Sequence, residues 1–110
     1  MLTNYKHVEI PKITGKLENV TAAENSDAKF TIRIGGGKPK PAIVWFIEEM
    51  EVVTTDERYE VAEVEDSVTL TIRKVKSEDA VSYYAKLVNE AGSVNSNKAT
   101  LTVNSTIFFL

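Results

Sequence analysis

The chain has 110 residues, of which 43% are hydrophobic and 26% charged, and this composition is typical of one soluble globular domain with a single modest core. Its net charge of −3, without a cationic block, argues against nucleic acid or an anionic membrane as a partner, and no apolar run is long enough to span a bilayer. It contains no cysteine, which excludes disulfides, thiolate catalysis and zinc–cysteine sites and favours a reducing compartment, since small secreted domains usually depend on disulfides.

The first nine residues show neither alternation nor the apolar segment of a signal peptide, so residues 1–9 are predicted to be a lead-in or linker. They contain the only histidine, His7, for which the sequence offers no partner in catalysis or metal binding. Residues 10–104 are predicted to form the folded domain.

Alternation of apolar and polar residues recurs in several short segments, as in half-buried β-strands. Other segments are short apolar runs rich in β-branched and aromatic residues, which also favour strands. The segments are residues 28–34, 43–47, 68–73, 81–88 and 99–103. We expect about seven to nine short strands and no substantial helix, hence an all-β sandwich or barrel.

Polar and turn-forming segments separate these strands. The run Gly35-Gly36-Gly37-Lys38-Pro39 is predicted to end a strand, because glycine costs conformational order and proline lacks the donor that a ladder needs. This run is not a phosphate-binding loop, because neither Gly-Lys-Ser/Thr nor a helix follows it. Residues 76–79 predict a polar crossover with room for one helical turn, and residues 89–92 predict a hairpin connection.

Three features leave alternatives open. The acidic residues between positions 56 and 66 lack the spacing of a calcium loop and are interpreted as a solvated strand edge, with ion binding or a basic partner as the alternative. The apolar tail, residues 105–110, is a linker, the start of a following module, or a docking segment for a neighbour. Val44, Phe46 and Ile47, on or near the outward side of a strand, are candidates for a contact surface, unless the hairpin around residues 50–53 covers them.

Five motifs follow one another in the order and spacing of a known family. They are Pro-x-Pro-x-x-x-Trp (Pro39, Pro41, Trp45), Leu-x-Ile (Leu70, Ile72), Asp-x-x-x-Tyr (Asp79, Tyr83), Asn-x-x-Gly (Asn89, Gly92) and Ala-x-Leu-x-Val (Ala99, Leu101, Val103). With these motifs, residues 11–103 resemble an intermediate-set immunoglobulin domain of the kind that giant muscle proteins such as titin and twitchin carry in tandem. The resemblance implies an immunoglobulin-like β-sandwich of two antiparallel sheets with Greek-key topology and, here, no disulfide.

The resemblance also implies roles for particular residues. Tyr83 becomes the tyrosine-corner residue, whose hydroxyl bonds backbone near the crossover, and Asp79 pairs with Arg58. The two positions that hold the disulfide cysteines in bridged members of the family are taken here by Ile32 and Ala85. A count back from Trp45 would instead place Arg33 at the first position, but that would bury a charge. The predicted structural core is Phe30, Ile32, Trp45, Leu70, Ile72, Tyr83, Ala85 and Leu101.

Two positions depart from the family pattern. Val81 stands where glycine is frequent, and Glu48-Glu49 stands where the turn after the tryptophan strand is usually Asp-Gly. Both departures predict altered local turn geometry within the same fold.

The resemblance implies a structural and protein-interaction module of a cytoplasmic, sarcomeric or cytoskeletal filament protein, acting as a mechanically stable bead in a tandem array. The expected partners are neighbouring domains and filament proteins, with no nucleic acid, membrane, small-molecule substrate or cofactor. Catalysis is not expected, because no nucleophile–base pair can be assembled. Two alternatives are an extracellular adhesion or receptor module lacking its disulfide, supported only by the sequons at Asn19 and Asn104, and a regulatory docking domain of a cytosolic muscle kinase.

Overall fold

The computed structural model describes residues 7–52 and 56–105, which form ten β-strands and one short 3-10 helix. In chain order these are β1 (Glu9–Thr14), β2 (Val20–Ala23), β3 (Ala28–Lys38), β4 (Ala42–Ile47), β5 (Met50–Glu51), β6 (Tyr59–Val64), β7 (Ser67–Ile72), η1 (Ser77–Asp79), β8 (Ser82–Asn89), β9 (Gly92–Asn95) and β10 (Ala99–Asn104). The strands exceed the expected number because β1, β2 and the two-residue β5 carry no clear alternation.

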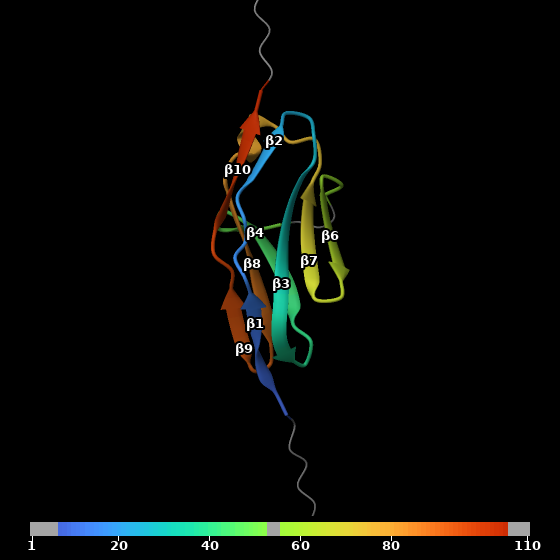
Figure 1. Ribbon diagram of the computed structural model, residues 1–110, viewed down its shortest axis with the longest axis vertical. Coiled ribbons are helices and arrows are strands. Elements are labelled where there is room, and N and C mark those ends of the chain that lie inside the picture. The colour runs from blue at the N-terminus through green and yellow to red at the C-terminus, as the bar shows by residue number, and fades with distance from the viewer. Residues whose placement is uncertain (1–6, 53–55, 106–110) are drawn as a thin grey trace, which may run out of the picture.

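The strands form two stacked sheets (Figure 1). One has four strands in the order β1-β3-β7-β6, and the other has the order β2-β10-β8-β4-β5, with β9 also paired to β8. All pairings are antiparallel except that of β2 with β10, which is parallel. The predicted all-β sandwich of two sheets is therefore confirmed.

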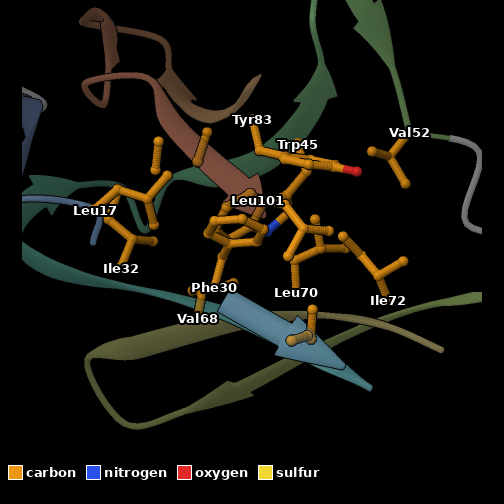
Figure 2. Packing of buried hydrophobic residues seen from close by; sticks show 14 of the residues in the cluster. Leu17, Phe30, Ile32, Trp45, Val52, Val68, Leu70, Ile72, Tyr83 and Leu101 are labelled. Carbon is orange, nitrogen blue, oxygen red and sulfur yellow. The ribbon is translucent and has the colours of Figure 1, made fainter. Parts of the chain in front are cut away.

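The core fills the space between the sheets because each strand turns alternate side chains inward. Figure 2 shows Trp45 of β4 and Tyr83 of β8, in the larger sheet, packed over Phe30 of β3 and Leu70 of β7, in the four-stranded sheet. Each of these four side chains is at most 2% exposed. Since one sheet supplies Trp45 and the other Phe30, the core depends on the two sheets being held together.

The glycine run does not end its strand, contrary to the sequence prediction. β3 continues through Gly35, Gly36 and Gly37 to Lys38 and pairs there with β1, with register shifts in the pairing. A Cβ at Gly37 would lie 2.8 Å from Pro41 Cγ and 3.0 Å from Pro11 Cα, and its φ is +131°. Glycine is needed at this position because the neighbouring strands approach too closely for a side chain, and pairing with β1 supplies the order that glycine lacks.

The other connections agree with the sequence. Residues 77–79 form the helical turn η1 in the crossover, and Asn89 pairs with Gly92 in the β8–β9 hairpin, as predicted. At the two departures from the family pattern, Glu48 adopts a positive φ of 57°, while Val81 packs against the core and accepts a hydrogen bond from the Leu101 amide at 3.1 Å. The chain enters the sandwich at one end of its long axis through β1 and leaves at the other end through β10 (Figure 1).

Candidate functional site

The predicted core residues all lie in the buried cluster between the sheets. Ile32, on β3, is 2% exposed and Ala85, on β8, is fully buried, so the two positions that bridged relatives fill with cysteine face inward from opposite sheets. Arg33, the alternative to Ile32, is exposed. The full predicted set in the cluster is Phe30, Ile32, Trp45, Leu70, Ile72, Tyr83, Ala85 and Leu101.

A group of polar contacts closes the end of the sandwich near η1. The Tyr83 hydroxyl donates to the Asp79 backbone carbonyl at 2.7 Å. The Asp79 carboxylate accepts from the Lys76 amide at 2.8 Å and from Arg58 Nη2 at 2.5 Å, and its side chain is only 7% exposed. Its hydrogen bond raises the pKa of the Arg58 guanidinium, while burial raises the pKa of the Tyr83 hydroxyl. These contacts join η1 to β8 and to the segment before β6.

The outer face of β4 and β8 is apolar. Because Trp45 and Tyr83 point into the core, Val44, Phe46 and Tyr84 point outward. Phe46 and Tyr84 stack with ring centroids 4.8 Å apart and planes 8° from parallel. Aromatic pairing of this kind covers apolar area and leaves Tyr84 8% exposed although it faces outward.

Residues on the same outer face extend this surface. Val88 lies half-buried on β8, two residues beyond Lys86 and on the same side. Lys98 Nζ lies 5.8 Å from the centroid of the Tyr84 ring and 3.2 Å from Glu49 Oε1. We call Val44, Phe46, Tyr84 and Val88 the apolar face.

The outer face of the other sheet is polar by contrast. On β3 the outward residues Lys29, Thr31 and Arg33 are exposed, and Thr31 Oγ1 lies 2.9 Å from Thr69 Oγ1 of β7. Antiparallel sheets usually turn a polar face to solvent. The apolar face is therefore a departure that distinguishes one side of this sandwich from the other.

Ile47 is not part of the apolar face, although the sequence suggested it. It lies two residues from Trp45, so alternation turns it inward, and it packs against the core. Of the hairpin that was to cover the strand, Val52 enters the core, Met50 is 76% exposed, and residue 53 lies outside the described part of the chain.

Sequence reasoning missed Tyr84 and Val88. The run of residues 81–88 is apolar apart from Ser82 and Lys86, so it predicts a strand but does not show which side chains face outward. Extending the alternation from Tyr83 would have placed Tyr84 and Val88 outward.

Two of the acidic residues between positions 56 and 66 pair with cations of the domain itself. Glu60 contacts Arg73, and Glu63 Oε2 lies 3.0 Å from Lys40 Nζ. Within residues 7–52 and 56–105, no group of His, Asp or Glu side chains is arranged to hold a metal ion. No helix in the described part of the chain is long and apolar enough to cross a membrane.

Comparison with known proteins places these features in a family. The profile of the immunoglobulin I-set domain matches residues 11–103. The muscle M-line assembly protein unc-89 of Caenorhabditis elegans is 32% identical over 108 residues, which are 98% of this chain and 1% of that protein. Titin of Drosophila melanogaster is 32% identical over 96 residues, which are 87% of this chain and a share of titin that rounds to 0%. The chain thus spans a very small part of these relatives.

Among solved structures, the titin domains Z1Z2 in complex with telethonin match with a TM-score of 0.79 and 26% sequence identity. The match covers 94% of this chain and 51% of that chain. The similarity extends over the whole sandwich.

Proposed function

The chain belongs to the immunoglobulin I-set family, and from this we propose that it is a structural and protein-interaction module of a sarcomeric or cytoskeletal filament protein, one mechanically stable bead in a tandem array. Its similarity to the muscle M-line assembly protein unc-89 and to titin supports this proposal. The folded unit would comprise residues 10–104, with residues 1–9 and 105–110 leading to its neighbours; residues 1–6 and 106–110 lie outside the described part.

The parallel pairing of β2 with β10 is the observation that carries the mechanical role. It joins Val20 to Leu101 and continues to Ala23 and Asn104, so it ties a strand near the start of the domain to its last strand. Since the chain enters and leaves at opposite ends (Figure 1), tension along the chain would shear this pair and load its hydrogen bonds together. Bonds loaded together resist more force than bonds broken one after another.

Force spectroscopy with two attachment geometries tests this role. Because the chain has no cysteine, engineered cysteines are unique attachment points. Pulling between Val8→Cys and Ser105→Cys shears the β2–β10 pair. Pulling between Glu24→Cys and Ser105→Cys peels it from one end, because the Glu24 amide bonds the Asn104 carbonyl at 2.8 Å. We expect a several-fold higher unfolding force in the first geometry, and equal forces would contradict the mechanical role.

The same proposal assigns the parent protein to the sarcomere or cytoskeleton in the cytoplasm, and it gives the domain no catalytic role and no cofactor. Its partners would be neighbouring domains and filament proteins, as titin Z1Z2 forms a complex with telethonin. Immunofluorescence of striated muscle with an antibody to this domain tests the location. Regular stripes are expected, whereas staining of the cell border would revive the extracellular alternative.

One of the two sequons that support the extracellular alternative begins with a residue that makes a structural contact. Asn19 Oδ1 accepts the Thr100 amide at 2.8 Å and so holds the start of β10 beside the segment before β2. This contact accounts for an asparagine at position 19 without a glycan.

A further inference from the structure

The apolar face has a central cation and an acidic border. Lys86 lies on β8 between Tyr84 and Val88, directly across from Val44, and it points outward like them. Glu51 lies on β5 directly across from Phe46, on the opposite side of β4 from Lys86. Glu51 and Lys86 thus flank β4 on its two sides, at register positions two residues apart along that strand, with Val44 and Phe46 between them.

Neither charge has an ion-pair partner in the part of the chain that the structure describes. Among the described residues, Lys86 and Glu51 form no ion pair, whereas Lys98 is paired with Glu49 and Lys40 with Glu63. Two free opposite charges on the two sides of one apolar strand make the face complementary to itself.

We propose that the apolar face is an interface for a second copy of this domain. A two-fold axis running roughly along β4 would turn one copy onto the other and exchange the two sides of that strand. Lys86 of each copy then meets Glu51 of the other, and the residues Val44 and Phe46 pack at the centre of the contact. The contact is isologous, with each charge pair formed twice.

This inference rests on the proposed interaction role and names its partner, a second copy that joins two parent chains side by side. The apolar face comprises only four residues, and Tyr84 among them is 8% exposed, so we expect a weak, concentration-dependent dimer rather than an obligate one, because stable interfaces bury about 800 Å² on each partner. Formation of two charge pairs predicts that the association weakens as salt is added.

Sedimentation velocity of the 110-residue chain over a wide concentration range, at low salt, tests the proposal. We expect a monomer–dimer equilibrium. Lys86→Glu and Glu51→Lys should each weaken it at least about tenfold, because each places two pairs of like charges in contact. The double variant Lys86→Glu/Glu51→Lys should restore the wild-type association, because it re-forms both pairs with the charges exchanged.

Arg33→Glu is the matched control. It changes net charge by the same amount as Lys86→Glu, but it lies exposed on the polar outer face of the other sheet, so association should be unchanged. Circular dichroism of each variant verifies its fold.

A chain that stays monomeric at every concentration would overturn the proposal, and so would a dimer that ignores both single reversals. Loss of association in the single variants without recovery in the double variant would also overturn it, since a direct contact of Lys86 in one copy with Glu51 in the other is re-formed when the two charges are exchanged. The force measurement above does not depend on any of these results, so failure of the dimer and failure of the mechanical role are distinguished.

Discussion

At Trp45 the free energy gained by burying an apolar ring exceeds the cost of leaving one buried N–H group without a hydrogen bond. Its indole Nε1 is buried and has no hydrogen-bond acceptor among the described residues. An unmade bond of this kind costs about 1–3 kcal/mol. Burying roughly 200 Å² of aromatic side chain at about 25 cal/mol per Å² contributes about 5 kcal/mol. The residue therefore stabilises the domain through its apolar area, as its position in the core cluster indicates.

Tyr83 is also buried, but its hydroxyl has a hydrogen-bond partner. Its burial makes the stability of the domain depend on pH in the alkaline range. Burial raises the pKa of Tyr83 above its ordinary value of 10. Above about pH 10 the unfolded chain releases the Tyr83 proton while the folded domain retains it, so stability falls as pH rises, by up to about 1.4 kcal/mol per pH unit.

The substitution Tyr83→Phe tests this linkage. At pH 7 it should cost about 1–2 kcal/mol, because the Asp79 carbonyl loses its donor. Above pH 10 the difference between wild type and variant should shrink, because the variant lacks the group that ionises. Urea denaturation of both proteins from pH 7 to 11 measures this difference in the free energy of unfolding. A difference that stays constant over the whole range would show that the Tyr83 proton does not contribute to the pH dependence of stability.

At the scale of elements, the close approach of β1 to the end of β3 requires a glycine at position 37. Gly37 lies under Pro41 and Pro11 with a positive φ, whereas Gly15, in the turn after β1, has a φ of +82° and no atom within 4 Å of its missing Cβ. Both glycines have a positive φ, but only at Gly37 would a side chain collide with neighbouring atoms. Comparing alanine substitutions at the two positions therefore separates the cost of backbone strain from the cost of the collision.

Gly37→Ala should therefore destabilise the domain by about 2–4 kcal/mol, from backbone strain and overpacking together. Gly15→Ala should cost about 1–2 kcal/mol, from backbone strain alone. The free energies of unfolding in urea give both values. Equal losses would mean that the approach of Pro11 and Pro41 does not constrain position 37.

For the whole molecule, the parallel β2–β10 pair and the asymmetry between the two outer faces matter most. The first connects the ends of the domain along the direction of pulling, and the second gives it one apolar and one polar side. Since the chain has no cysteine, the two sheets are held together by the packing of the core between them.

Local pattern in the sequence predicted an all-β sandwich or barrel, the shared side of Phe30 and Ile32, and the hairpin at Asn89, whereas the choice of the sandwich and the core position of Trp45 came from the resemblance to the family. Alternation decides which side of a strand a residue occupies, and turn chemistry decides where many strands end. Both depend on neighbours along the chain, so both can be read from a single sequence.

The tertiary structure alone decided the features that depend on distant residues. β3 runs through three glycines because β1 pairs with it, and β10 lies parallel to a strand some 80 residues earlier in the chain. The outward stack of Tyr84 on Phe46 exists only because β4 and β8 are neighbours in register. The strength of these contacts depends on which strands meet, and alternation along one strand carries no information about its partner.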